Sequence, residues 1–356
     1  MKIIHIIDSL AIGGAEQLLS GVIQSTDQFD HTVVYLNGQN DYVEELSRAS
    51  LYCLNYENRF NTFSAVLKLK QIFDTIQPDI IHSHLPTATY LTRLANYNKC
   101  KIYFTVHNCL SKSSFKKSKL TWLLEKILYK KNHHALFVSE AVKEDYDNEI
   151  GIKGEYSILY NFVENVFFEH YKERNFDYGN KPLLKFVSIG TLKEQKNHSF
   201  LIDNFTKLSS YEYTLDIIGA GPQKMFLIDK INKLGASNIS LRMGVRDLQQ
   251  ELGAYDFFIL ASKYEGFGIA PVEAMATGLP LVLADINVFQ EVTNGNASFF
   301  DIDKPDTLLN FLHSIPEKSA EIKKKCDNGR VWAIKQFTKR NYISKLLAIY
   351  SETHGK

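Results

Sequence analysis

The feature that most constrains the fold is the order of apolar and glycine-rich segments over residues 256–285. An apolar run at 256–262 indicates a buried strand. Residues 265–268 follow as a glycine-rich turn, and the good helix formers at 270–278 end in glycine, with a proline two residues later. A second apolar run completes the unit. The order strand, glycine turn, helix and strand is typical of a parallel sheet that helices cover.

The glycine-rich turn of this unit has the chemistry of a phosphate-binding site. Its backbone N–H groups point past the carboxyl end of the strand, and it leads into a helix N-terminus, where anions are stabilised. Two acids flank the turn: Glu265 lies in it, and Glu273 lies about one helical turn into the helix. Both carboxylates can therefore face one ligand. The alternative for the same spacing is a surface helix with two solvated acids.

With this context, the segment E-G-F-G-I-A-P-V-E-A-M-A (265–276) resembles the E-x7-E motif of retaining glycosyltransferases with the two-lobed GT-B fold, specifically glycosyltransferase family 4. The resemblance covers essentially the whole chain and is densest from 183 to 292. It implies an α/β protein with two Rossmann-like, doubly wound parallel-sheet domains that face a cleft. The implied parts are an acceptor-binding domain (1–164), a linker (165–182), a nucleotide-sugar-binding domain (183–335) and a C-terminal helix (336–356) that crosses back to the first domain.

Composition narrows the class of protein. A length of 356 residues fits about two domains. A net charge of +1 gives no overall attraction to nucleic acid. The four cysteines show no metal-binding spacing and are typical of reduced thiols. No apolar stretch approaches the ~20 residues of a membrane-spanning helix. We expect a cytoplasmic protein, either free or held peripherally on the inner membrane face.

The first half of the chain alternates between predicted strands and helices, which indicates a parallel sheet with helices on both faces. In such sheets, ligands bind beyond the carboxyl ends of the strands. The predicted strands are 2–8, 31–36, 78–84, 101–108 and 134–140, and the predicted helices include 63–73 and 87–94.

Gly13 and Gly14 lie where the first strand gives way to the first helix, a usual place for a phosphate to approach the backbone. A tight turn is the alternative interpretation, and no G-x-G-x-x-G dinucleotide fingerprint is present. The G-G-A-E run also resembles the family's first loop, which faces the donor's phosphates.

Three histidines follow predicted strands. By resemblance, the T-V-H-N loop places His107 against the transferred sugar; alone, it would fit a core or a site equally well. His82 and His84 share one face of a strand, but no carboxylate or cysteine completes a metal-binding set nearby, so packed or cleft-lining histidines are favoured over a metal.

The segment from Lys112 to Lys131 is basic, with Glu125 as its single acid. Leucines and a tryptophan alternate with the lysines, which predicts a basic amphipathic helix over 119–131. Attachment to an anionic membrane surface is one interpretation, at about 1 kcal/mol per lysine. A helix packed on the sheet with solvated lysines is the other.

In the second half, the strand at 181–190 and the loop at 191–198 resemble the family's G-R-L-x-x-x-K-N-H segment. By this resemblance Lys196 neutralises the donor's diphosphate. Thr191 replaces the family's arginine, and Lys193 or Arg246 would have to substitute for it. The I-I-G-A-G-P run resembles a loop near the nucleotide, and 239–247 resembles the segment that holds the base.

The resemblance thus implies catalytic roles for Glu265, His107 and Lys196. It implies that Glu273 binds the ribose hydroxyls, and it assigns donor binding to a set of loop residues. These are Gly13, Gly14, Gly190, Thr191, Gly219, Gly244, Val245, Gly266, Phe267, Gly268, Ile269 and Glu273. Asp301 and Asp303 form a D-x-D pattern that belongs to a different glycosyltransferase fold, and we interpret it as a loop coincidence.

The implied function is a retaining hexosyltransferase. It would move a sugar from a nucleoside-diphosphate donor, with UDP favoured, to a glycan or lipid-linked acceptor in capsule or surface-polysaccharide synthesis. Lys196 and the backbone N–H groups stabilise the leaving phosphate, so we expect neither metal nor other cofactor. Two alternatives are a GT-B sugar-nucleotide epimerase and a non-catalytic nucleotide-sugar-binding partner subunit. A dehydrogenase is disfavoured because both glycine motifs fail its fingerprint.

Overall fold

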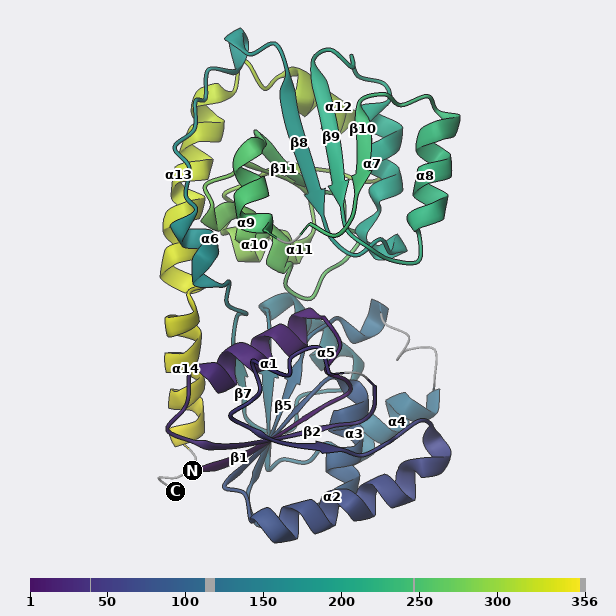
Figure 1. The fold of residues 1–356 in the computed structure, drawn as a ribbon, viewed down its shortest axis with the longest axis vertical. Coiled ribbons are helices and arrows are strands. Elements are labelled where there is room, and N and C mark those ends of the chain that lie inside the picture. Colours follow the sequence, from purple (N-terminus) through teal and green to yellow (C-terminus); the bar gives the residue numbers. More distant parts are fainter. Residues whose placement is uncertain (39, 113–118, 246, 353–356) are drawn as a thin grey trace. The chain divides into compact units, whose positions relative to one another are not determined.

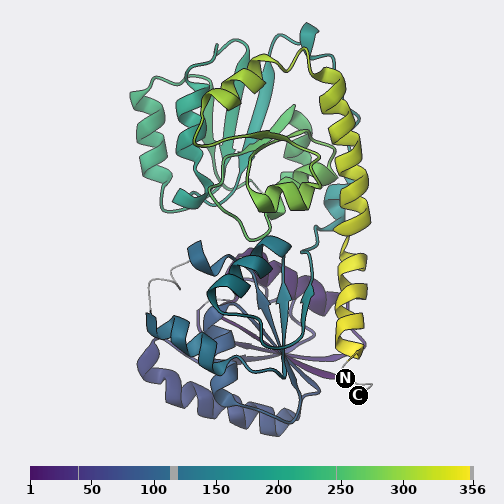
Figure 2. The ribbon, with the colours of Figure 1, turned by 180° about the vertical axis from the view of Figure 1, so that it is seen from behind.

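The computed structural model describes residues 1–38, 40–112, 119–245 and 247–352. The chain divides into two compact units: unit 1 comprises residues 1–161 and 339–356, and unit 2 comprises 162–338 (Figure 1). Each unit is built on its own parallel sheet with helices on both faces, as the ribbon shows from front and back (Figures 1 and 2). The predicted α/β architecture of two doubly wound parallel sheets is therefore confirmed.

Unit 1 has a seven-stranded sheet within its described residues, in the order β3-β2-β1-β4-β5-β6-β7. The strands are β1 (Lys2–Ile7), β2 (Asp30–Tyr35), β3 (Ser50–Cys53), β4 (Ile80–His84), β5 (Lys101–Val106), β6 (His133–Phe137) and β7 (Tyr156–Ile158). Its helices are α1 (Gly14–Gln24), α2 (Thr62–Ile76), α3 (Pro86–Ala95), α4 (Lys119–Leu128), α5 (Glu140–Glu149) and α14 (Lys339–Ser351).

Alternation of side chains assigns these helices to the two faces of the sheet. Ile4 and Ile6 of β1 pack with α2 and α3 on one face. Ile7 packs with α1 on the other face. The same face as α1 also carries α14, because the hydroxyl of Tyr350 lies 2.6 Å from Nδ1 of His82. The C-terminal helix is thus part of the covering of this sheet.

Unit 2 has a six-stranded sheet among the residues described, in the order β10-β9-β8-β11-β12-β13. The strands are β8 (Leu184–Ile189), β9 (Tyr213–Ile218), β10 (Ile239–Arg242), β11 (Phe257–Leu260), β12 (Leu281–Ala284) and β13 (Ser298–Phe300). Its helices are α6 (Asn165–Glu169), α7 (His198–Phe205), α8 (Lys224–Lys233), α9 (Leu248–Glu251), α10 (Ile269–Ala276), α11 (Asn287–Thr293), α12 (Asp306–His313) and α13 (Ser319–Gln336).

The segment predicted as a linker, 165–182, is packed into unit 2 instead. It contains α6, and the ring of Tyr178 belongs to the main hydrophobic core of unit 2. Arg174 donates hydrogen bonds to three carbonyl oxygens of unit 2, including that of Gly278 at 2.6 Å. The buried ring of Tyr178 and the three hydrogen bonds of Arg174 hold this segment in place, although its polar sequence shows no helix or strand periodicity.

The end of the chain differs from the predicted run in having two helices rather than one. α13 ends at Gln336 and α14 begins at Lys339. Between them, Thr338 pairs with Val163, whose N–H donates to the carbonyl of Phe337 at 2.8 Å. A strand-like pairing of these two segments, which both lie at the end of unit 2, therefore separates the two helices. No helix in the described part of the chain is long and apolar enough to cross a bilayer.

Candidate functional site

The strand order of unit 2 reverses between β8 and β11, which are neighbours although β9 and β10 separate them in sequence. A reversal of this kind opens a crevice at the carboxyl ends of the two strands, the usual ligand site of a doubly wound sheet. The loop after β8 carries Gly190 to Lys196, and the loop after β11 carries Ser262 to Gly268. The topology thus joins the two segments that the sequence singled out.

Lys196 and Glu265 form an ion pair between these two loops. Nζ of Lys196 lies 2.6 Å from Oε1 of Glu265, and both side chains are largely buried. Oε1 also accepts the hydroxyl of Ser262 at 2.7 Å. The second oxygen, Oε2, lies 3.4 Å from the side-chain amide of Gln195. Glu265 is therefore held in one orientation by three neighbours, at the reversal point of the sheet.

Two glycines let these loops approach each other. The alkyl chain of Lys196 lies over Gly190, where an added Cβ would stand 3.2 Å from its Cε atom. At Gly219, after β9, an added Cβ would stand 1.9 Å from the carbonyl oxygen of Gly190. A side chain at Gly219 would displace the backbone of the lysine-bearing loop, and one at Gly190 would press on the alkyl chain of Lys196. This packing gives a physical reason for two of the predicted donor-binding glycines.

Helix α10 begins at the carboxyl end of β11 and carries the second acid of the motif. Gly268 caps it with a φ of +82°, in the left-handed region, and an added Cβ there would lie 2.8 Å from Cε1 of Phe289. Gly266 and Ile269 flank this turn. The carboxyl of Glu273 makes no side-chain hydrogen bond to any described residue, and burial together with Glu164 raises its pKa to about 7. Glu273 is thus a sheltered carboxyl available to a ligand.

The remaining predicted residues of unit 2 differ in their surroundings. Thr191 is exposed at the start of its loop. The ring of Phe267 is buried edge-on against Phe337, with centroids 5.5 Å apart, so only its backbone could serve a donor. Gly244 has a φ of +68° with open space around it, and Val245 follows it. Arg246, suggested as a substitute cation, lies outside the described residues.

The predicted phosphate loop at Gly13 and Gly14 in unit 1 is filled by the side chain of a nearby acid, Glu16. Gly13 caps α1 and Gly14 is its first residue, but an added Cβ on Gly13 would lie 2.3 Å from Oε2 of Glu16. Oε1 of Glu16 accepts the hydroxyl of Ser9 at 3.3 Å. Burial raises the pKa of Glu16. A phosphate at this helix N-terminus would therefore have to displace or neutralise the Glu16 side chain.

His107 follows β5 at the carboxyl edge of the same sheet. Its Nε2 atom is buried and makes no hydrogen bond among the described residues. Burial lowers the pKa of His107 to about 4, so the imidazole is neutral near pH 7. A neutral ring can donate or accept one hydrogen bond through Nε2. This side chain has the unused hydrogen-bonding capacity that a sugar-binding role requires.

The other histidines form a cluster that the sequence only partly indicated. His5 joins His82 and His84, with one ring nitrogen of each within 4.8 Å of the others. Nδ1 of His5 lies 3.4 Å from Nε2 of His84. Both ring nitrogens of His82 already have hydroxyl partners, Tyr350 at 2.6 Å and Thr105 at 2.7 Å. The cluster is hydrogen-bonded within the sheet and its helices, which agrees with the packed interpretation.

Sequence reasoning missed several neighbours of the site. Ser262 and Gln195 orient Glu265, and Glu164 contributes to the raised pKa of Glu273. Ser262 is the last residue of the predicted strand and could have been flagged by its place at the carboxyl edge. The other two have no sequence signal, because the contacts arise only when separate loops meet.

The predicted amphipathic helix also differs from expectation. α4 ends at Leu128 rather than 131. Glu125, the single acid of the basic segment, is buried and forms an ion pair with Arg93 of α3. Leu123 and Ile127, one turn apart, are 47% and 62% exposed. The helix therefore anchors itself to the unit through its acid and leaves two apolar side chains in solvent.

Comparisons with known proteins agree with this architecture. Residues 12–165 match the family model described as Glycosyltransferase Family 4, and residues 171–327 match the model described as Glycosyl transferases group 1. A Klebsiella pneumoniae protein described as an uncharacterized 41.2 kDa protein in the cps region is 23% identical over 98% of this chain and 99% of its own. The Escherichia coli O-antigen biosynthesis glycosyltransferase WclY is 24% identical over 88% of each chain.

Among solved structures, Anabaena Alr3699/HepE in complex with UDP and glucose superposes with a TM-score of 0.84 at 18% identity, over 99% of this chain and 100% of that one. This likeness shows the fold, which is GT-B. Together, the two family models cover every strand of the two sheets except β1, and they include Lys196, Glu265 and Glu273. The chain belongs to the GT-B glycosyltransferases of the family 4 type.

Proposed function

We propose that this glycosyltransferase moves a sugar from a UDP-linked donor to a glycan or lipid-linked acceptor, with retention of anomeric configuration. The observation that carries the proposal is the Lys196–Glu265 pair at the reversal point of the unit 2 sheet. It combines a cation for a leaving phosphate with a carboxylate for sugar hydroxyls. Nearby lie the capping turn of α10 and the sheltered carboxyl of Glu273.

Each group has a defined task as the glycosidic bond to phosphate breaks. Negative charge grows on the leaving diphosphate, and Lys196 with the N–H groups at the start of α10 stabilises it. Glu273 accepts hydrogen bonds from the ribose hydroxyls. Glu265 holds hydroxyls of the transferred sugar. Because these groups can balance the developing charge, we propose that the transfer needs no metal.

Retention would follow from attack on the same face of the sugar that the phosphate leaves. In this scheme a phosphate oxygen takes the proton from the acceptor hydroxyl as the new bond forms. Glu265 is committed to Lys196 and Ser262, which favours a positioning task over that of a nucleophile. Trapping a glycosyl group on a carboxylate of this protein would contradict the scheme.

The proposed donor and process draw on the similar proteins. The Anabaena structure holds UDP and glucose. WclY is named for O-antigen biosynthesis, and the Klebsiella relative is named for its cps region. We infer that the acceptor belongs to a surface polysaccharide or its lipid-linked precursor.

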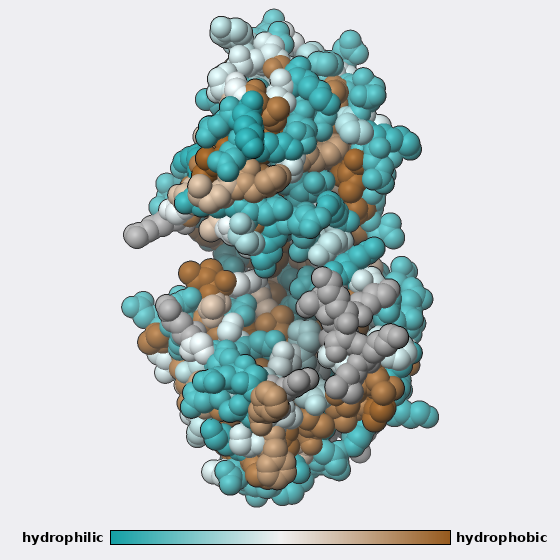
Figure 3. Space-filling model, turned by 90° about the vertical axis from the view of Figure 1, so that its right-hand side faces the viewer, coloured by the Kyte–Doolittle hydropathy of each residue, from teal (hydrophilic) through white to brown (hydrophobic). Residues whose placement is uncertain are grey.

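We also propose that unit 1 touches an anionic membrane surface. α4 exposes Leu123 and Ile127. Phe60, just before α2, and Phe63, in the first turn of α2, are exposed as well. Lys130 and Lys131 follow α4 in the basic segment. Hydrophobic residues stand out in patches among hydrophilic ones on the unit 1 part of the face drawn in Figure 3. Apolar side chains beside lysines suit reversible attachment to such a surface.

The direct test is incubation of the purified protein with UDP-sugars and a mixture of lipid-linked glycan acceptors, followed by product analysis. Transfer gives UDP and an extended acceptor whose anomeric configuration NMR can assign. An epimerised nucleotide sugar without any acceptor product would indicate the epimerase instead. Binding of UDP with no turnover would favour a non-catalytic partner subunit, for which the exposed Thr191 in place of arginine is the supporting observation.

A further inference from the structure

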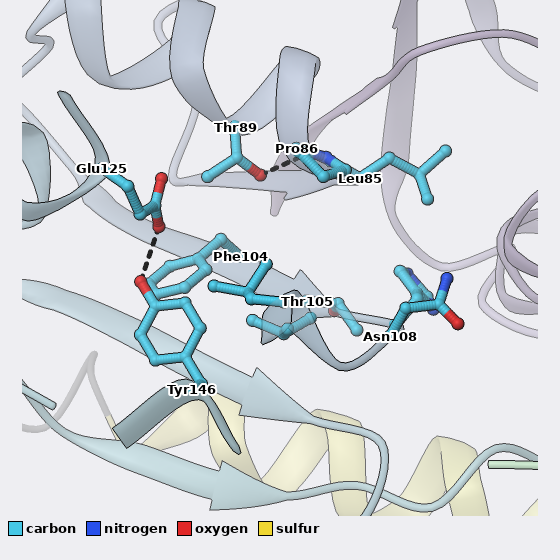
Figure 4. Close-up of a pocket in the computed structure, with 11 residues that line it drawn as sticks. Leu85, Pro86, Thr89, Phe104, Thr105, Asn108, Glu125 and Tyr146 are labelled. Atoms are coloured by element: carbon cyan, nitrogen blue, oxygen red, sulfur yellow. Dashed lines mark hydrogen bonds between the residues drawn. The ribbon is translucent and has the colours of Figure 1, made fainter. Parts of the chain in front are cut away.

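Unit 1 contains a cavity of about 100 Å³ at the carboxyl ends of β4 and β5 (Figure 4). Two hydrogen bonds lie in its walls, as the dashed lines mark. The hydroxyl of Thr89 donates to the carbonyl of Leu85 at 2.8 Å. The hydroxyl of Tyr146 on α5 donates to Glu125 on α4 at 2.5 Å. These bonds hold the packing of unit 1 together. A polar network of a different kind lies beside the candidate site of unit 2.

Five side chains form this network on one face of the unit 2 sheet. Arg242, the last residue of β10, faces Glu251 of α9, with Nη1 2.7 Å from Oε2 and Nη2 3.1 Å from Oε1. Nη1 also donates to the hydroxyl of Tyr255 at 2.8 Å, and this hydroxyl donates to Oδ2 of Asp216 at 2.6 Å. The hydroxyl of Ser240 donates to Oδ1 of Asp216 at 2.6 Å. Two parallel bonds between a guanidinium and a carboxylate fix the orientation of both groups.

The pair of Arg242 and Glu251 closes the loop that follows β10. The two residues are nine positions apart. Between them lies the β10 loop, residues 243–247, of which 243–245 and 247 are described. Arg242 is held in the sheet by its pairing with Ile218 of β9. The β10 loop is therefore anchored at one end by the sheet and at the other by the bridge to α9, which restricts the conformations open to it.

The β10 loop lies next to the loop after β8, which belongs to the candidate site. The N–H of Gly219 donates to the carbonyl of Arg242 at 3.0 Å, and an added Cβ on Gly219 would lie 1.9 Å from the carbonyl oxygen of Gly190. No backbone hydrogen bond joins Gly244 or Val245 to another residue that the structure describes. The β10 loop thus presents backbone donors and acceptors at the carboxyl edge of the sheet, where they can bond the edge of a planar base.

We propose that Arg242 and Glu251 are positioning residues for the donor, and that their bridge holds the β10 loop in the conformation that receives the nucleotide base. The inference rests on the proposed function, since it concerns the base of the donor whose diphosphate lies at Lys196. A loop that is already in place binds without a further cost of ordering. Without the bridge, only the fraction of molecules with the loop in place can bind the base, and the apparent Kd rises accordingly.

A bridge that only stabilised unit 2 would behave differently. The side chains of Arg242 and Glu251 are 36% and 32% exposed, and water screens ion pairs at such positions. General destabilisation would weaken the binding of every ligand of unit 2 alike. A positioning role affects only ligands that reach the β10 loop. Pyrophosphate has the two phosphates of the donor but no base, so it separates the two roles.

Calorimetric titration of UDP and of pyrophosphate into Arg242→Ala and Glu251→Gln tests the proposal. If the released loop is in place about one-fifth of the time, each variant binds UDP about fivefold more weakly and pyrophosphate as the wild type does. The double variant should bind UDP no more weakly than the single variants, because both changes break the same bridge. Glu321→Gln breaks an exposed 2.7 Å pair with Lys325 on α13 and should change neither affinity.

Hydrogen exchange gives a second measurement that needs no ligand. The amides of the β10 loop should exchange faster in Glu251→Gln than in the wild type or in Glu321→Gln. Because Glu251→Gln keeps the size of the side chain, it serves if Arg242→Ala does not fold. Unchanged exchange, unchanged UDP affinity, or equal losses for UDP and pyrophosphate would each overturn the proposal.

The wild-type titrations separate this inference from the proposed function. If the wild-type protein bound neither UDP nor ADP nor GDP, the donor proposal and the positioning proposal would both fail. If another of these nucleotides bound more tightly than UDP, the same comparison of variants would be made with that nucleotide. If the preferred nucleotide bound equally well to the wild type and to both variants, only the positioning proposal would fail.

Discussion

At the scale of single residues, the site depends on a charge pair shared by two loops. Lys196, after β8, forms an ion pair with Glu265, after β11, at 2.6 Å. Because the pair is largely buried, removal of either member leaves the other with fewer partners in a poorly solvated place. The pair should therefore govern both the position of the donor and the rate of transfer.

We expect Lys196→Ala to lower kcat/KM for transfer by about 10²–10³-fold, the usual loss when one stabiliser of a developing negative charge is removed. UDP binding should weaken as well, because the diphosphate loses its cation. Initial rates and calorimetric titration measure the two effects. Lys185→Ala, on the solvent-exposed amino-terminal part of β8, is the control and should change neither. Similar losses in both variants would refute the role of Lys196.

A second expectation concerns the charge of Glu273. With a pKa of about 7 in the free protein, its carboxyl is half protonated at neutral pH. Ribose hydroxyls bind better to the ionised form, so UDP affinity should rise between pH 6 and pH 8. Glu273→Gln should bind UDP more weakly and without this rise. Pyrophosphate, which has no ribose, corrects for titration of the phosphates. If Glu273→Gln kept the rise in UDP affinity, another residue would be the titrating group that causes it.

The same carboxyl affects stability with a defined sign. Its folded-state pKa is raised above the ordinary value of 4.5, so the folded protein holds this proton more tightly than the unfolded chain. The contribution is complete below pH 4.5 and is lost as pH rises through 7. Glu273→Gln should therefore raise the melting temperature at pH 8 more than at pH 5. An equal change at both pH values would contradict the assignment.

At the scale of elements, the sequence indicated the strand, turn and helix around residues 256–285 because each carries a local signal. Apolar runs, glycines and helix formers lie in one contiguous stretch. The contacts of Glu265 with Gln195 and Lys196 span about seventy positions and depend on β8 and β11 being neighbours. A family motif could supply Lys196, but no local pattern supplies Gln195.

The turn that starts α10 gives an element-scale prediction. Gly268→Ala places a Cβ on left-handed backbone and 2.8 Å from Phe289, so we expect a loss of roughly 1–3 kcal/mol in the free energy of unfolding. Chemical denaturation measures it. Gly295→Ala is the matched control, with a φ of +70° and no atom within 4 Å of the added Cβ. Equal losses would mean that backbone strain, and not the contact with Phe289, sets the effect.

Helix α4 shows why amphipathicity alone was insufficient. The lysines of its segment predicted a basic face, and no local pattern assigned a role to the single acid, Glu125. Arg93 lies on α3, more than thirty positions earlier, and its burial requires a carboxylate beside it. The pairing therefore decides which side of α4 faces the unit. Only the folded arrangement of α3 and α4 contains that information.

At the scale of the whole molecule, alternating strands and helices were enough to predict two parallel sheets, since this alternation has few other solutions. The segment 165–182 was misassigned as a linker because its packing depends on scattered anchors, Tyr178 and Arg174, rather than on a repeating pattern. The strand at Ser50–Cys53 was missed because it is a short edge strand with largely exposed side chains. Elements with a regular apolar pattern could therefore be predicted from the sequence, whereas segments held by isolated anchoring residues could not.

The last prediction joins the histidines of the unit 1 sheet to the stability of the molecule. His5, His31, His82 and His84 are buried, and burial lowers the pKa of each below 6.5. The unfolded chain therefore binds protons first as pH falls below 6.5, and stability declines by up to about 1.4 kcal/mol per pH unit for each such histidine. Unit 1 should unfold before unit 2 on acidification.

Calorimetric melting between pH 7 and pH 5 tests this expectation. His84→Gln removes one titrating group from the cluster, so its melting temperature should fall less steeply with acidification than that of the wild type, even if it is lower at pH 7. His313→Gln, at an exposed position of α12, should keep the wild-type slope. If the melting temperature of His84→Gln fell as steeply with acidification as that of the wild type, the buried histidines would not cause the loss of stability. Other titratable groups would then be responsible for it.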